Sequence, residues 1–132
     1  MSHHQFMTRS DLIEIRDVEG MGRGVFAVSP IPEDTLLCSD PVVMVPESQC
    51  PKGSVLAAYV FYWSVVMEDG RGLNAIALGL GTVMNHSKRP NVIVWFEQNP
   101  DRLDFYALRD IEPGEQLTHD YNYDEYPPDW KT

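Results

Sequence analysis

Apolar and polar residues alternate in short runs along the first half of the chain, a pattern typical of strands with one buried face. Residues 12–15 predict a strand, and a glycine-rich turn at residues 19–24 leads to a second strand at residues 25–27. Aliphatic runs at residues 35–38 and 42–45 predict two further short strands. The first half is therefore expected to be a series of strands joined by tight turns.

Longer apolar segments follow in the middle of the chain. Residues 55–67 are almost continuously apolar and aromatic, so periodicity does not separate a buried strand from a helix. Their aromatic and β-branched residues favour a strand from Tyr59 onward. Residues 73–84 predict a short, tightly packed helix that ends at Asn85, because two glycines within them weaken a longer one.

A β-hairpin is predicted at residues 92–97 and 103–108, around a turn of Gln, Asn, Pro and Asp. Many short strands with few helices indicate a mainly β fold. A weak sign of an internal repeat is that three apolar residues recur 80 positions later, in the pairs Ala27 and Ala107, Ile31 and Ile111, and Leu37 and Leu117.

Length and composition are those of one folded domain. The chain has 132 residues, of which 43% are hydrophobic, and its 10 prolines and 9 glycines are spread along it. We expect residues 1–10 to be a flexible N-terminus and residues 11–132 to form the domain, with a short aromatic C-terminal tail. Apolar runs are shorter than the roughly 18 residues of a membrane-spanning helix, so we expect an intracellular, cytoplasmic protein with no membrane contact.

The net charge of the chain favours some classes of binding partner over others. A formal net charge of -10 predicts repulsion from nucleic acid and from anionic membranes, and attraction to a basic protein or peptide. The same acidity also fits a role in solubility alone. With only two cysteines, Cys38 and Cys50, and without Cys/His spacing, the chain predicts neither a disulfide framework nor a metal site.

Two polar clusters follow apolar runs and are candidates for chemistry. Asn85 and His86 fit a helix cap, or else a grip on the carboxylate or ammonium of an amino acid, since an amide both donates and accepts. Asp120 and Tyr121 end a strand-like segment, and Tyr121 is either a buried phenol with one hydrogen bond or a group that projects into a cavity. The residues alone leave both alternatives open.

Tyrosines are dense around these clusters and could line a narrow apolar channel with hydroxyls at one end. Such a channel would hold the stem of a lysine by apolar and cation-π contact. The tyrosines concerned are Tyr59, Tyr62, Tyr121, Tyr123 and Tyr126. A glycine pair at residues 22–24 allows close backbone approach to a ligand, although such a turn is more often structural.

In order and spacing, these motifs resemble the signature of SET-domain protein lysine methyltransferases, and most of all the small stand-alone viral and bacterial SET proteins. The matching segments are residues 22–27, 77–79, 85–87, 90–91 and 115–121. The resemblance implies a β-clip fold of several small curved sheets with short helices and a knot-like threading of the C-terminal segment. It also implies that Asn85 and His86 lie beside Asp120 and Tyr121.

The same resemblance implies S-adenosylmethionine as cofactor and assigns roles to single residues. Tyr121 matches the catalytic tyrosine. The cofactor-binding residues would be Met21, Gly22, Arg23, Gly24, Asn85, His86, Tyr121 and Trp130. The substrate lysine channel would be lined by Tyr59, His119, Tyr123 and Tyr126. His119 stands where family members often carry Phe or Tyr, a position that influences how many methyl groups are added.

The expected function is therefore transfer of a methyl group to a lysine ε-amine in a basic protein, histone or other. An alternative is a catalytically inactive SET-like module that binds basic peptides. A third reading, an unrelated β-rich interaction domain, requires the motif segments to lie apart in space. A homodimer through residues 59–63 is left open, as is a nuclear location if the source is eukaryotic or viral.

Overall fold

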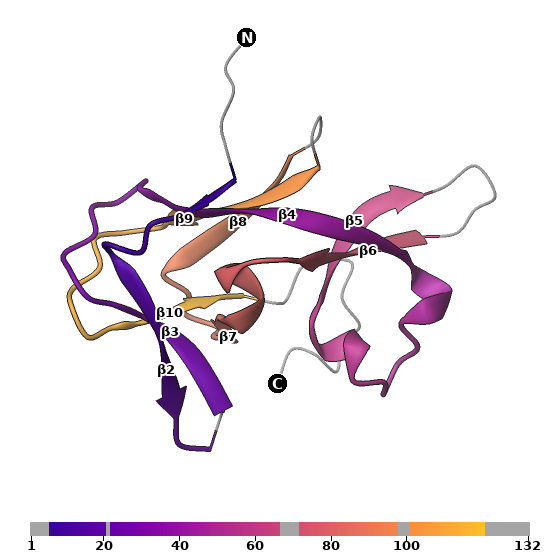
Figure 1. Ribbon diagram of the computed structural model, residues 1–132, viewed down its shortest axis with the longest axis horizontal. Coiled ribbons are helices and arrows are strands. Elements are labelled where there is room, and N and C mark those ends of the chain that lie inside the picture. The colour runs from indigo at the N-terminus through magenta and orange to yellow at the C-terminus, as the bar shows by residue number, and fades with distance from the viewer. Residues whose placement is uncertain (1–5, 21, 67–71, 98–100, 121–132) are drawn as a thin grey trace, which may run out of the picture.

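The computed structural model describes residues 6–20, 22–66, 72–97 and 101–120, which form two curved sheets (Figure 1). The strands are β1 (Met7–Thr8), β2 (Ile13–Val18), β3 (Gly22–Ala27), β4 (Leu36–Pro46), β5 (Val60–Val66), β6 (Gly72–Ala77), β7 (Asn85–His86), β8 (Val92–Glu97), β9 (Arg102–Ala107) and β10 (Gln116–His119). Short 3-10 helices lie at η1 (Glu47–Gln49), η2 (Leu56–Ala58) and η3 (Leu80–Val83). The mainly β fold expected from the sequence is confirmed.

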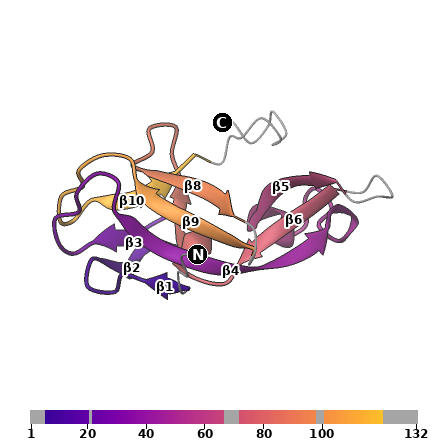
Figure 2. The same cartoon turned by 90° about the horizontal axis from the view of Figure 1, so that it is seen from above.

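A six-stranded sheet has the order β5-β6-β4-β9-β8, with β1 paired to β4, and a four-stranded sheet has the order β2-β3-β10-β7. Strand β4 runs along most of the molecule and joins a lobe that carries β2 and β3 to one that carries β5 and β6 (Figure 2). β10 lies beside β3, in the lobe that carries β2 and β3 (Figure 2). The C-terminal strand is thus inserted into the four-stranded sheet beside elements far from it in sequence.

β4 is one strand where the sequence predicted two. It pairs with β9 from Leu36 to Pro41 and with β6 from Val42 to Pro46. Proline has no N–H to give to a ladder. Pro41 lies where the strand changes partners, and its carbonyl accepts the N–H of Leu78. The interruption in the apolar pattern therefore marks this change of partners within a continuous strand.

The helix predicted over residues 73–84 is wrong for most of its length. β6 occupies its first part and pairs with both β4 and β5, and only η3 is helical. Long-range pairing outweighs local helix propensity here, because Ala75 and Ala77 are buried against the neighbouring strands. Asn85 consequently belongs to β7 and does not cap a helix. The strand expected from Tyr59 is confirmed as β5, and the hairpin at residues 92–108 as β8 and β9.

Ordered structure begins earlier than the expected boundary at residue 11. Met7 pairs with Ser39 and Thr8 with Cys38, and the N–H of Arg9 donates to the carbonyl of Leu37 at 2.9 Å. These hydrogen bonds place residues 7–9 in the six-stranded sheet.

Among the described residues, no helix is long and apolar enough to cross a membrane.

A reciprocal pair of hydrogen bonds joins the two halves of the chain. The N–H of Ile31 donates to the carbonyl of Ile111 at 2.9 Å, and the N–H of Ile111 donates to the carbonyl of Ile31 at 2.8 Å. On one side of this bridge β4 pairs with β9, and on the other β10 pairs with β3, both antiparallel. Each half therefore contributes one strand to each pairing.

The turns that follow the bridge repeat the same geometry. Asp34 has φ 68° and Gly114 has φ 91°, so both adopt the left-handed conformation. The N–H of Asp34 donates to the carbonyl of Ala107, and that of Gly114 to the carbonyl of Ala27, both at 2.8 Å. The recurrence of apolar residues 80 positions apart thus corresponds to two equivalent strand-turn segments that are hydrogen-bonded to each other.

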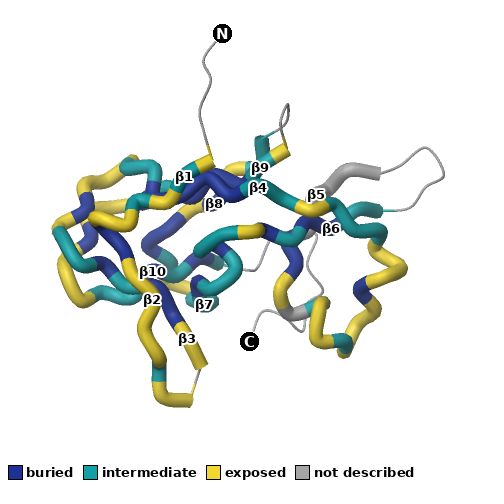
Figure 3. The backbone as a smooth tube through the Cα atoms, in the orientation of Figure 1, coloured by how far each residue is buried: buried dark blue, intermediate teal, exposed yellow. Residues whose placement is uncertain are grey.

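The core lies along β3, β4 and β9, where buried residues are concentrated (Figure 3). It is one apolar cluster shared by both sheets. Side chains with at most 1% exposure include Val25, Ile31, Leu37, Met84, Leu103, Phe105, Ile111 and Leu117. Several of these belong to the paired segments, so the repeat and the core stabilise each other.

We expect Ile111→Ala to lower the free energy of unfolding by about 2–5 kcal/mol, because it leaves a cavity where a fully buried side chain stood. Ile15→Ala is the matched control, since Ile15 is 44% exposed, and its cost should be well below 1 kcal/mol. Urea unfolding followed by tryptophan fluorescence measures both. Equal costs for the two variants would contradict the central place of the bridge.

Candidate functional site

β10 brings the two polar clusters of the sequence together. It pairs antiparallel with β3, with Gln116 opposite Phe26, and parallel with β7, with Thr118 opposite Asn85 and His119 opposite His86. The N–H of Ser87 donates to the carbonyl of His119 at 3.1 Å. The segment 85–87 and the segment that ends at Asp120 are therefore neighbours in space.

Asn85 connects three strands through its side-chain amide. Its Nδ2 donates to the carbonyl of Arg23 at 2.9 Å and to Oε1 of Gln116 at 2.7 Å. Gly24 lies against this pair, and a Cβ built there would be 2.5 Å from Gln116 Oε1 and 3.1 Å from Asn85 Nδ2. Glycine is thus required by the close approach of the two amides. The glycine segment and Asn85 are in contact, which argues against the interpretation in which the motif segments lie apart.

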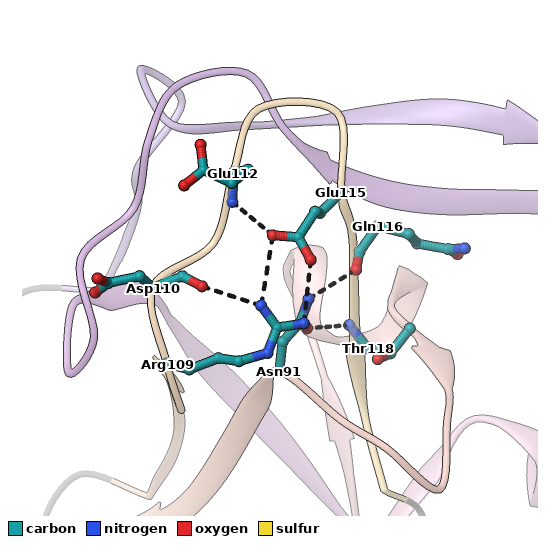
Figure 4. A network of polar contacts seen from close by, with 7 residues as sticks. All are labelled: Asn91, Arg109, Asp110, Glu112, Glu115, Gln116 and Thr118. Atoms are coloured by element: carbon teal, nitrogen blue, oxygen red, sulfur yellow. Dashed lines mark hydrogen bonds and ion pairs between the residues drawn. The ribbon is translucent and has the colours of Figure 1, made fainter.

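Asn91 holds the opposite edge of β10 (Figure 4). Its Nδ2 donates to the carbonyl of Gln116 at 2.9 Å, and its Oδ1 accepts the N–H of Thr118 at 2.8 Å. The backbone N–H of Asn91 also donates to the carbonyl of Thr118 at 3.2 Å. Since Asn91 is only 3% exposed, one buried residue takes the place of a neighbouring strand and fixes the position of β10.

The turn before β10 is stabilised by a carboxylate (Figure 4). Glu115 accepts the backbone N–H of Glu112 at 2.6 Å and is bound by Arg109 at 3.1 Å. The hydrogen bond from the Arg109 guanidinium, and next the one from Glu112, hold the pKa of Glu115 below its ordinary value. Because these groups are exposed, they shape the turn more than they stabilise the fold.

His86 and Asp120 lie side by side where β7 and β10 end. Nδ1 of His86 is 3.7 Å from Oδ1 of Asp120, and the side chains are 20% and 36% exposed. This separation is longer than a hydrogen bond, and both side chains are partly exposed. The sequence places Tyr121 directly after Asp120.

His119 is buried among aromatic rings. It stacks on Phe61 with centroids 5.4 Å apart and meets the edge of Phe105 at 5.9 Å. Burial, together with the nearby His86, lowers the pKa of His119 to about 3. The imidazole is therefore neutral at physiological pH and contributes an aromatic surface with two polar nitrogens.

A buried carboxylate supports the segment that leads into β7. Oδ2 of Asp40 accepts the N–H of Gly81 at 2.9 Å. The Asp40 carboxylate fills the space that a side chain at Gly79 would need, and the Phe105 ring together with Asp40 fills that at Gly81. Burial raises the pKa of Asp40 to about 6. Two glycines therefore allow η3 to pack directly on β4, and this packing sets the position of β7, which begins at Asn85.

The structure brings some of the predicted site residues together and leaves others outside its described part. Gly24 lies against the hydrogen-bonded side chains of Asn85 and Gln116. The carbonyl of Arg23 accepts a hydrogen bond from the Asn85 amide. Tyr59 precedes β5 and is 51% exposed. Met21, Tyr121, Tyr123, Tyr126 and Trp130, as well as the expected knot-like threading of the C-terminal segment, lie outside the described residues.

Sequence reasoning missed three residues that build the site: Phe61, Asn91 and Gln116. Phe61 lies in the ambiguous apolar run, and nothing in that run distinguishes it from its aromatic neighbours. The position of Gln116 could have been predicted from the pattern of its strand, because Gln116 alternates with the buried Leu117 on a strand that reaches the site. Asn91 belonged to the recognised motif but had no role assigned to it.

The residues present fit a cofactor with an amino acid part. Asn85 uses both amide hydrogens within the protein, so its Oδ1 is the atom that remains to accept from a ligand. Gly22 is exposed and has φ 85°, and a Cβ built there would meet nothing within 4 Å, so a ligand can approach this backbone. Within the described ranges, no three His, Cys, Asp or Glu side chains are grouped to hold a metal ion.

A family model described as SET domain matches residues 22–122. The chain belongs to the SET-domain family. The match includes the glycine segment of β3, the pair Asn85 and His86, and β10. The resemblance found in the sequence is thereby confirmed at the level of the family, together with the fold.

Two curated relatives of this SET domain come from Schizosaccharomyces pombe. A histone-lysine N-methyltransferase specific for H3 lysine-37 is 38% identical over 113 residues, which cover 83% of this chain and 72% of the relative. One specific for H3 lysine-36 is 30% identical over 122 residues, which cover 86% of this chain and 15% of the relative. The chain thus spans most of the first relative and a small part of the second.

Among solved structures, Arabidopsis thaliana SUVH6 in complex with SAM superimposes on this SET domain with a TM-score of 0.67 and 21% sequence identity. The likeness covers 84% of this chain and 28% of that chain. At this identity the likeness concerns the fold.

We expect His119→Phe to make stability less sensitive to acid. In the wild type the unfolded chain takes up a proton at His119 near pH 6.5, whereas the folded chain does so near pH 3, so stability is lost as pH falls below 6.5. Between pH 7.5 and 5.0 the wild type should lose about 2 kcal/mol more than the variant. Urea unfolding at both values measures this difference, and identical losses would show that His119 is not buried as a neutral ring.

Proposed function

We propose that this SET domain transfers a methyl group from S-adenosylmethionine to the ε-amine of a lysine in a basic protein. One observation supports the proposal above all: β10 pairs both with the glycine strand β3 and with Asn85-His86 of β7, within the matched SET segment. The two S. pombe relatives are named histone-lysine N-methyltransferases, and SUVH6 was solved with SAM.

The substrate is proposed to be a histone tail or a similar basic segment. A net charge of -10 favours a Lys- and Arg-rich partner over nucleic acid. A histone substrate implies a nuclear location. Several expectations stay predictions: the cytoplasmic location, the absence of nucleic acid and membrane binding, the homodimer, the extension of the domain to residue 132, and the likeness to viral and bacterial SET proteins.

In the mechanism, this chain's residues bind and orient, while the cofactor supplies a methyl group on a positively charged sulfur. Gly22 would let the cofactor approach the backbone, Gly24 leaves room for the contact between Asn85 and Gln116, and Asn85 would accept a hydrogen bond from the cofactor. Asn85 and His86 are held beside the strand that precedes Tyr121 in sequence. The cofactor and the lysine would then meet where β7 and β10 end. Most of the rate is proposed to come from this alignment.

The lysine must lose its proton before it attacks. An apolar channel and the positive sulfur both lower the pKa of a lysine amine. We assign the proton to solvent and give the Tyr121 hydroxyl the role of orienting the nitrogen, since an ordinary phenol is a weak base at neutral pH. Tyr59, Tyr123 and Tyr126 are proposed to line the channel, with Trp130 over the cofactor and Met21 beside it.

His119 is proposed to limit the space beside the methyl group from within the protein. Its ring is 1% exposed and stacked on Phe61, so it resembles an aromatic wall more than a proton carrier. The number of methyl groups added would then depend on how this wall fills the channel.

A second candidate function is a SET-like module that binds basic peptides without catalysis. The charge of the chain fits it equally well. Calorimetry separates the two proposals: binding of a Lys-rich peptide with strong salt dependence, but without binding of S-adenosylmethionine, favours the module.

We expect Tyr121→Phe to lower the methylation rate about 100-fold or more, because the hydroxyl that orients the reacting atoms is lost. Incubation with labelled S-adenosylmethionine and core histones, read by mass spectrometry, measures the rate and the methylated site. Cofactor affinity should stay within a few-fold of wild type.

Tyr106→Phe is the matched control for this change, because Tyr106 lies in β9 of the six-stranded sheet. It should keep most of the wild-type rate. If the wild type binds cofactor but methylates no lysine in any basic protein, the enzymatic proposal is wrong.

A further inference from the structure

The amide of Asn85 is held in one orientation by its surroundings. The carbonyl of Arg23, 2.9 Å from Nδ2, can only accept a hydrogen bond, so it must face the NH₂ side of the amide. A flipped amide would place two acceptors against each other. The first of the two amide hydrogens is therefore fixed by a backbone group.

Gln116 binds the second hydrogen. Its Oε1 is 2.7 Å from Asn85 Nδ2, and this contact joins β10 to β7 between side chains that lie 31 positions apart in sequence. A glutamine carries both a donor and an acceptor, and only the acceptor suits this neighbour. The absent Cβ of Gly24 leaves the room in which the two amides meet.

With both hydrogens bound, Asn85 offers a ligand its oxygen. Among the residues that the structure describes, none donates to Oδ1 of Asn85. An amide oxygen accepts from an ammonium group, which has only donors, and repels a carboxylate, which has only acceptors. Asn85 thus recognises the amino end of an amino acid, where the sequence left the carboxylate and the ammonium as alternatives.

We propose that Gln116 is a positioning residue for cofactor binding, which acts through Asn85 by fixing its amide so that Oδ1 is the acceptor for the cofactor's ammonium group. The inference rests on the proposed function, because it takes the ligand to be S-adenosylmethionine or its product. Without an acceptor at position 116, one N–H of Asn85 loses its partner, and a single hydrogen bond to the Arg23 carbonyl holds the amide less firmly. Binding of the amino acid part then weakens, while binding of the adenosine part is unaffected.

Two variants and two ligands test this inference. Gln116→Met keeps the length of the side chain and removes the acceptor, whereas Gln116→Glu keeps an acceptor in the same place. S-Adenosylhomocysteine carries the amino acid part, and 5′-methylthioadenosine lacks it. Isothermal titration calorimetry gives the dissociation constant of each ligand, and Gln49→Met, at an exposed glutamine in η1, is the matched control.

For Gln116→Met we expect S-adenosylhomocysteine to bind about 10-fold more weakly and 5′-methylthioadenosine to bind within about twofold of wild type. Gln116→Glu should restore S-adenosylhomocysteine binding to within about threefold, and Gln49→Met should change neither ligand. Equal weakening of both ligands, or no weakening of S-adenosylhomocysteine, would overturn the inference and leave the proposed function intact. Failure of the wild type to bind S-adenosylhomocysteine would instead overturn the proposed function.

A measurement on the wild type guards against a variant that does not fold. In a ¹⁵N-labelled protein, both side-chain amide protons of Asn85 should exchange slowly with solvent, because each is hydrogen-bonded. Rapid exchange of either proton would overturn the inference without any substitution.

Discussion

The reciprocal hydrogen bonds between Ile31 and Ile111 are the constraint on which the rest of the structure depends. They join two strand-turn segments 80 residues apart, each of which places a strand beside a strand of the other half. One product of this bridge is the β4-β9 pair, which belongs to the core. The other is the β3-β10 pair, which belongs to the site. The same bridge therefore supports both the core and the functional centre.

The site shows how little of its geometry comes from rigid secondary structure. β7 has two residues and β10 has four, and both are positioned largely by side chains. Asn91 binds one edge of β10, while Asn85 and Gln116 connect the other elements. Side-chain amides suit this task, because each one donates and accepts in fixed directions and remains neutral. Asp40 accepts the N–H of Gly81 and so holds η3, the segment that leads into β7.

Much of this could be predicted from the sequence, and the failures have a common cause. Apolar runs and turn residues predicted β2, β3, β8 and β9, although among these four only β8 begins with a regular alternation of buried and exposed residues. The helix predicted over residues 73–84 was wrong because Ala75 and Ala77 fit a helix locally, while the pairing of their strand with β4 and β5 is visible only in three dimensions. The motifs located Gly24 and Asn85. They did not reveal Gln116, whose role depends on the strand edge that it faces, or the burial of His119 against Phe61.

The central claim is that β3, the segment 85–91 and β10 form one cofactor site. Hydrogen-deuterium exchange with and without S-adenosylhomocysteine tests it most directly, because it reports all three segments in one experiment. We predict that peptides covering residues 22–27, 85–91 and 116–120 become protected together when the ligand binds. Protection confined to other segments, such as residues 55–66, would contradict the account.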